Sequence, residues 1–171
     1  TLMEIQCALE NPFNPGVFGI TLEKVMQTQE QAYPQAQVPI ILMFLTDAML
    51  ALDALKTRGI FRVAGTPDEV IELRVRIERG HYSLSGLLGA DNSDVTVPAS
   101  VFKLWLRELE EPLIPQSLYN DCVDAAASHS PDACIELVRE LPTLHRRVVL
   151  FVISFLQMFC EPTVLRSTRC E

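Results

Sequence analysis

The stretch VPASVFKLWLRELEEP, residues 97–112, decides the class of fold that this sequence predicts. Pro98 suits the first turn of a helix, where its missing N–H would be unpaired anyway, and Pro112 lies past the expected helix end. Apolar side chains recur at helical spacing between the two prolines, at Val101, Leu104, Trp105 and Leu109. We expect one helix here, with these residues on the side that faces the core.

Similar helical patterns cover most of the remaining chain. They predict helices at 21–32, 38–55, 66–80, 116–129, 130–142 and 143–160. The segment 38–55 is apolar on nearly every face, so it is expected to be buried, and the segment 143–160 is expected to be a second buried helix. Residues 81–95 look like a loop, and no stretch shows convincing strand alternation. The predicted class is therefore all-α, with roughly seven helices.

Capping residues mark several of the expected helix starts. Thr21 and Ser130 are of the types that accept a hydrogen bond from the first turn of a helix. Thr66 and Glu69 have the spacing of a capping box, and Pro67 lies at the first helical position between them.

The composition indicates one folded domain. The chain has 171 residues, 49% of them hydrophobic, which is enough to bury a substantial core. The formal net charge of −8 argues against nucleic acid as the main partner, because phosphate backbones are bound by basic surfaces. It does not argue against a few local cations that bind a single phosphate group.

Five cysteines are scattered along the chain, at Cys7, Cys122, Cys134, Cys160 and Cys170. The odd number argues against a disulfide framework, and the wide spacing argues against a zinc site. We therefore interpret them as reduced thiols of a cytoplasmic protein. The apolar run from Val148 to Cys160 contains Ser154 and Gln157 and is too short to span a bilayer, so we expect no membrane insertion.

One arginine interrupts an apolar stretch that has a glycine at each end, GIFRVAG, residues 59–65. A buried guanidinium carries a desolvation cost unless it has a partner. Two explanations fit Arg62. It forms a salt bridge to one of the 22 acidic residues, or it is a rigidly placed cation that stabilises negative charge on a phosphoryl oxygen. The stretch by itself leaves both explanations open.

Two further cations, Lys103 and Arg107, lie four residues apart on the helix expected at 97–112 and so project from the same face. Like charges at this spacing destabilise a helix by roughly 0.2–0.5 kcal/mol. Either nearby acids relieve the repulsion or the two cations meet an anionic partner. The candidate acids are Glu108, Glu110 and Glu111.

Other kinds of chemistry find little support in the sequence. His81, His129 and His145 are isolated and lack the spacing of a metal site, so we expect no metal. The chain has no glycine-rich phosphate loop. We therefore expect no cofactor or nucleotide bound by this chain itself.

Three blocks occur in an order and at separations that resemble the Rho-family GTPase-activating (RhoGAP) domain. They are LKTRGIFRVAG at 55–65, VPASVFKLWLRELEEPLIP at 97–115 and LVRELPTLHRRVVLFVISFL at 137–156. With VFGITLEKVM at 17–26, the match covers residues 17–161. The sequence LWLRELEEPLIP looks closest to the subgroup in which this domain follows a MyTH4 module.

The resemblance implies a helical bundle that binds GTP-loaded small GTPases of the Rac, Rho or Cdc42 type and speeds their GTP hydrolysis. The family's arginine finger, supplied in trans, falls on Arg62, and its GTPase-contacting lysine falls on Lys103. Arg107 is expected to support the finger loop by hydrogen bonds, together with Gly59 and Phe61. GTP and Mg²⁺ would belong to the partner, so the chain would be an activator and not itself an enzyme.

The alternative is a non-catalytic module of the same fold that binds GTPases or other proteins without stimulating GTP hydrolysis. In either case we expect an irregular lead-in at 1–16 and a RhoGAP-like domain at 17–171. We expect a cytoplasmic protein whose recruitment to a membrane or to the cytoskeleton depends on other domains.

The end of the chain departs from the family pattern. The family continues with an NLA…PN segment, for which CEPTVLRSTRCE, residues 160–171, offers no counterpart. We expect that segment to be either deleted or not represented in this sequence, between about Val164 and Leu165, and the later helices of the family to be missing as well.

Overall fold

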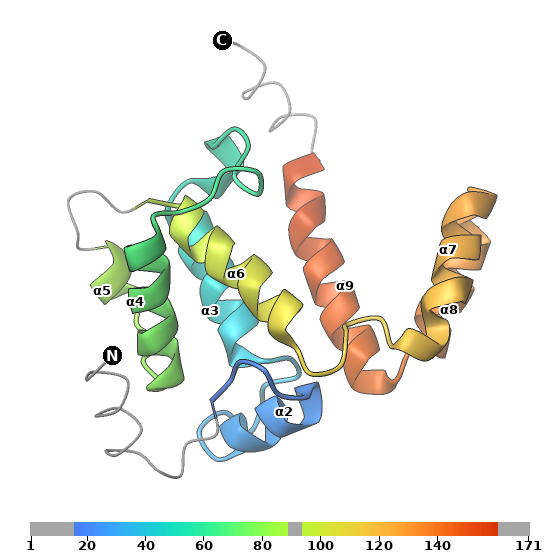
Figure 1. The fold of residues 1–171 in the computed structure, drawn as a ribbon, viewed down its shortest axis with the longest axis horizontal. Helices are drawn as coiled ribbons and strands as arrows, with labels where there is room; N and C mark the ends of the chain where they lie inside the picture. Colours follow the sequence, from blue (N-terminus) through green and yellow to red (C-terminus); the bar gives the residue numbers. More distant parts are fainter. Residues whose placement is uncertain (1–15, 89–93, 161–171) are drawn as a thin grey trace.

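The computed structural model describes residues 16–88 and 94–160, and every regular element in those residues is a helix (Figure 1). The elements are α2 (Leu22–Glu30), α3 (Ile40–Ala51), η1 (Ala54–Lys56), α4 (Pro67–Glu78), α5 (Ser85–Leu88), α6 (Thr96–Glu108), η2 (Gln116–Leu118), α7 (Tyr119–Ser128), α8 (Pro131–Glu140), α9 (Thr143–Gln157) and η3 (Met158–Cys160). Because α5 has only four residues, seven longer α-helices remain in this part of the chain. The all-α class and the predicted number of helices are confirmed.

Helix α6, predicted from residues 97–112, packs against both α3 and α4 (Figure 1). Val101, Phe102 and Trp105 point into the core, and the indole of Trp105 is fully enclosed. Burial of one large apolar side chain stabilises the folded state by about 1.5–3 kcal/mol. The apolar spacing of this segment therefore makes α6 a rigid central element.

Two of the predicted helix caps form, and the predicted capping box does not. The Thr21 side chain accepts a hydrogen bond from the Lys24 N–H at 3.3 Å, and Ser130 caps α8 in the same way. Thr66 is the N-cap of α4, but its side chain makes no capping bond. Pro67 contributes no N–H to the first turn, so fewer N–H groups need a cap. Two acidic side chains in that turn stabilise the helix start by interacting with the positive end of the helix dipole.

The segment 38–55 is not a single helix, which corrects the prediction. Helix α3 is buried as expected but ends at Ala51. Asp53 then adopts a left-handed conformation, with φ of 57°, and the short η1 turn follows. Aspartate tolerates this backbone because its short polar side chain can bond locally. The break redirects the chain from α3 toward the stretch that carries Arg62.

The predicted loop at 81–95 contains the short helix α5, which is a small correction. Three parts of the sequence lie outside the described residues: 1–15, 89–93 and 161–171. They hold most of the expected lead-in, part of the expected loop, and the position near residue 164 where a family segment is expected to be missing.

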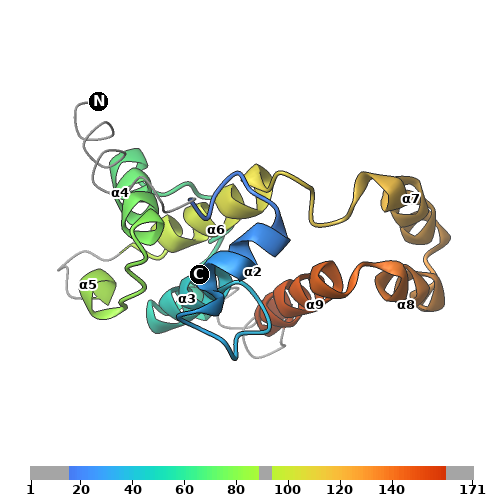
Figure 2. The ribbon, with the colours of Figure 1, turned by 90° about the horizontal axis from the view of Figure 1, so that it is seen from below.

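Helix α9 is buried on one side only, which corrects the prediction of a second fully buried helix. Four residues of this helix are buried: His145, Val148, Val149 and Phe155. Three large apolar residues of the same helix are exposed: Leu150, Ile153 and Leu156. Helices α7 and α8 pack against each other at one end of the molecule, away from α3 and α4 (Figure 1, Figure 2). An apolar pattern does not reveal which side of a helix has a neighbour.

The prediction that the apolar segment ending at Cys160 is too short to span a bilayer is also corrected. Helix α9 and η3 together form an 18-residue segment, Thr143–Cys160, that is long and apolar enough to cross a membrane. This criterion considers only length and composition, and the core helix of a soluble protein satisfies it too.

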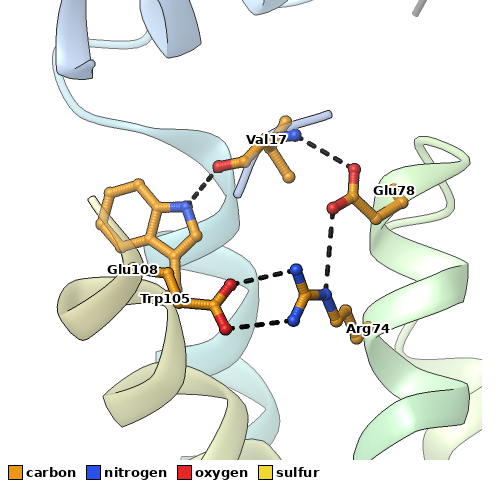
Figure 3. Close-up of polar contacts among 5 residues, drawn as sticks. All are labelled: Val17, Arg74, Glu78, Trp105 and Glu108. Atoms are coloured by element: carbon orange, nitrogen blue, oxygen red, sulfur yellow. Dashed lines mark hydrogen bonds and ion pairs between the residues drawn. The ribbon is translucent and has the colours of Figure 1, made fainter. Parts of the chain in front are cut away.

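A cluster of polar contacts joins the chain before α2 to helices α4 and α6 (Figure 3). Arg74 binds both carboxylate oxygens of Glu108, at 3.1 and 3.0 Å, and its Nε lies 4.0 Å from Glu78. Glu78 accepts the N–H of Val17 at 3.2 Å, and the indole N–H of Trp105 donates to the Val17 carbonyl at 2.7 Å. The backbone at Val17 is therefore held from two helices, and the buried indole N–H is satisfied.

This cluster predicts a pH-dependent contribution to stability. Burial raises the pKa of the Glu78 carboxyl, against the opposing effects of the Val17 N–H and of Arg74. The folded state therefore binds this proton more tightly than the unfolded chain does. The resulting stabilisation is complete below the unfolded pKa and is lost as pH rises through the folded pKa.

We expect Glu78→Gln to flatten the dependence of the free energy of unfolding on pH above the ordinary glutamate pKa of 4.5, measured by urea titration. Glu72→Gln, at an exposed position of the same helix, is the control. A Glu78→Gln profile parallel to that of the parent would contradict this assignment.

Candidate functional site

Residues 57–66, here called the arginine loop, connect η1 to α4 and carry Arg62. A tight turn begins at Gly59, whose φ of +72° lies in the left-handed region that glycine adopts without strain. The N–H groups of Arg62 and Val63 both donate to the Gly59 carbonyl, at 2.8 and 2.9 Å. A Cβ on Gly59 would lie 3.6 Å from the Arg62 Nε, so part of the arginine side chain lies next to this glycine.

The two residues before Arg62 attach the loop to the core. Ile60 is buried, and the half-buried ring of Phe61 packs edge-on against two aromatic rings. These are Phe155 of α9 and Phe159 of η3, with ring centroids at 6.4 and 5.2 Å. The loop therefore lies beside the C-terminal end of α9 (Figure 1). Such edge-to-face pairs add about 0.5–1.5 kcal/mol beyond the area they bury.

Helix α6 holds the loop at two points on either side of Arg62. The Lys103 ammonium donates to the Phe61 carbonyl at 2.8 Å, and the Gly65 N–H donates to the Ser100 hydroxyl at 2.9 Å. Gly65 also lies against the helix backbone, since a Cβ there would come within 2.8 Å of the Val97 Cα. Only glycine permits this close approach.

The Arg62 side chain is exposed and makes no hydrogen bond or ion pair with any residue in 16–88 or 94–160. Within those residues, the salt-bridge explanation for this arginine is therefore wrong. What remains is a cation that projects from an anchored loop. The apolar neighbours in GIFRVAG fix the loop, and the guanidinium stays available to another molecule.

The acids that could relieve the repulsion between Lys103 and Arg107 are engaged elsewhere. Glu108 binds Arg74, Glu110 binds Lys24 at 3.4 Å, and Glu111 lies 3.7 Å from His145. In the described part of the chain, the local-acid explanation therefore fails. The loop and α6 present a group of cations on a protein whose net charge is −8.

Arg107 does not have the contact that the family resemblance implied. Its side chain is exposed and forms no hydrogen bond to the arginine loop among the described residues. The bond to the loop comes from Lys103, one helical turn earlier, because the Lys103 side chain faces the Phe61 carbonyl. In this structure the supporting role therefore belongs to Lys103.

Sequence reasoning missed three residues that position the loop: Ser100, Phe155 and Phe159. The two phenylalanines lie four residues apart on an apolar helix, which by itself indicates only core packing. Ser100 has no local signal at all, because its partner Gly65 lies 35 residues away in the sequence.

The histidines and cysteines of the described residues form no site. No group of three or more His, Cys, Asp or Glu side chains in that part of the chain could hold a metal ion. His145 is buried and its Nδ1 lies 3.0 Å from the Leu113 carbonyl, which gives it a structural partner. Among the described cysteines, Cys122, Cys134 and Cys160 are free thiols.

Comparison with known proteins identifies the family. The RhoGAP domain model matches residues 39–167, which is most of the chain. The chain belongs to the RhoGAP family. The resemblance on which the site residues were predicted is therefore confirmed at the level of the family, whereas the MyTH4-linked subgroup stays a prediction.

Relatives of this RhoGAP domain are found in distant organisms. GTPase activating protein homolog 3 of Dictyostelium discoideum is 35% identical over 141 residues, 82% of this chain and 10% of the relative. Human Rho GTPase-activating protein 4 is 33% identical over 150 residues, 86% of this chain and 15% of the relative. This chain therefore corresponds to a small part of the curated proteins that it matches.

The fold has a counterpart among solved structures. The crystal structure of human Rho GTPase activating protein 15 superposes with a TM-score of 0.69, at 24% sequence identity. The superposition covers 89% of this chain and 70% of the other. This similarity supports the helical fold.

Lys103 bonds the arginine loop and Arg107 does not, so substitutions of these two residues can be compared directly. Lys103→Met keeps an unbranched stem but removes the charged hydrogen bond to the Phe61 carbonyl, so we expect it to lower the free energy of unfolding by about 1.5–3 kcal/mol. Arg107→Met removes an exposed cation and should change that value by less than about 0.5 kcal/mol. Urea unfolding of both variants measures the difference, and a larger loss from Arg107→Met would contradict the assignment.

Proposed function

We propose that this chain stimulates GTP hydrolysis on Rho-family small GTPases of the Rac, Rho or Cdc42 type, and that it does so by inserting Arg62 into the partner's nucleotide site. The observation that carries the proposal is an exposed guanidinium without an intramolecular partner among the described residues, on a loop that the core and α6 both anchor. Membership of the RhoGAP family supports the choice of partner.

Arginine suits this task for physical reasons. Its guanidinium stays protonated and offers a planar fork of donors that fits phosphoryl oxygens. During GTP hydrolysis, negative charge is spread over the γ-phosphoryl group and the leaving oxygen, and a fixed cation at that place lowers the barrier. Because the loop is anchored before the partner arrives, less conformational entropy is lost when Arg62 is ordered.

Lys103 and Arg107 extend the positive surface from the loop along α6. Lys103 uses one of its three donors on the Phe61 carbonyl, so the others can contact an acidic partner. Arg107 is fully available at the surface. In this proposal GTP and Mg²⁺ belong to the GTPase, and the chain acts as an activator without an active site of its own.

We expect Arg62→Ala to lower the single-turnover rate of stimulated GTP hydrolysis by roughly 10³–10⁵-fold, the usual contribution of an arginine finger. Arg58→Ala is the matched control, because Arg58 is an exposed arginine of the same loop, four residues earlier. It should retain most of the stimulation. The rates are measured on GTP-loaded Rac, Rho and Cdc42, and an Arg62→Ala variant as active as the parent rules out the mechanism.

Affinity measurements separate this function from a non-catalytic binding module. A domain that supplies an arginine to the transition state should bind a GTPase loaded with GDP and aluminium fluoride more tightly than one loaded with a GTP analogue. Arg62→Ala should abolish that preference and retain binding to the GTP-analogue form. Equal affinity of the parent for both forms would favour the non-catalytic module.

A further inference from the structure

The exposed tip of the arginine loop is short and is held on both sides. Arg62, Val63 and Ala64 are exposed, whereas the flanking residues Phe61 and Gly65 are attached to α6. The attachments come from Lys103 and Ser100, which lie three positions apart and so on the same face of the helix. Three residues between two fixed peptides have little freedom to change direction.

The second of these attachments is the hydrogen bond between Ser100 and Gly65. Ser100 is half-buried, and its hydroxyl accepts the Gly65 N–H at 2.9 Å. The close approach of Gly65 to the Val97 backbone keeps this N–H near α6. If the hydroxyl is removed, a partly buried N–H loses its partner, and water or a shifted loop must satisfy it.

We propose that Ser100 is a positioning residue for Arg62: its hydrogen bond to the Gly65 N–H fixes the C-terminal side of the loop and with it the direction in which the arginine projects. This inference rests on the proposed function of Arg62. In this proposal Ser100 affects the reaction only through the position of Arg62.

The test uses affinities of the full chain for a Rho-family GTPase in two loaded forms, GDP with aluminium fluoride and a GTP analogue. The variants are Ser100→Ala and Arg62→Ala, singly and combined, with Ser154→Ala as the matched control at an exposed position of α9. Thermal unfolding midpoints of all variants show that each is folded at the assay temperature. Gly65→Ala serves as a second variant, because its Cβ would come within 2.8 Å of the Val97 Cα and should push the loop away from α6.

We expect Ser100→Ala to weaken binding of the aluminium fluoride form roughly three- to tenfold, as the loss of one hydrogen bond predicts, and binding of the GTP-analogue form by less than about twofold. In the Arg62→Ala background the same substitution should change neither affinity by more than about twofold. Gly65→Ala should show the same pattern, and Ser154→Ala should match the parent.

Two results would overturn the inference about Ser100. Either Ser100→Ala leaves the preference for the aluminium fluoride form unchanged, or its effect persists in full when Arg62 is already removed. Failure of the proposed function looks different, because then the Arg62→Ala variant itself keeps the preference of the parent.

Discussion

The contact between α6 and the arginine loop is the constraint on which the rest of this structure depends. Two side chains on one face of the helix hold the peptides that flank Arg62. Their effect requires that α6 itself does not move. Packing against α3 and α4 secures the helix along its length, and the Glu108–Arg74 pair secures its C-terminal end. The position of one exposed arginine therefore follows from the core.

The arrangement of charge explains why this arginine remains available. The acids that follow Lys103 and Arg107 along the chain bind cations or a histidine elsewhere. A chain with a net charge of −8 thus keeps a local group of cations without neutralising it among the described residues. Long-range attraction to an acidic partner surface is weakened by salt, so association at this face should depend on ionic strength.

Much of this fold could be predicted from local patterns. The apolar spacing around Trp105 identified α6, and the hydroxyl residues Thr21 and Ser130 marked two helix starts that the structure contains. The GIFRVAG stretch was enough to single out Arg62, because a charge within an apolar run needs an explanation. These signals depend on residues that are close together in the sequence.

Contacts between distant segments could not be predicted in this way. Lys103 and Phe61 lie 42 residues apart, and nothing near either residue shows that the ammonium faces that carbonyl. The resemblance to a family therefore led to Arg107 as the supporting residue, although Lys103 makes the bond. The exposure of one side of α9 could not be predicted for the same reason, because periodicity shows which residues share a face of a helix but not which face has a neighbour.

The most direct test of this account is a crystal structure of the chain bound to a Rho-family GTPase that carries GDP and aluminium fluoride. We predict that the Arg62 guanidinium contacts the fluoride group while Gly65 stays hydrogen-bonded to Ser100. A complex in which Arg62 lies in solvent, or binds a carboxylate of its own chain, would contradict it.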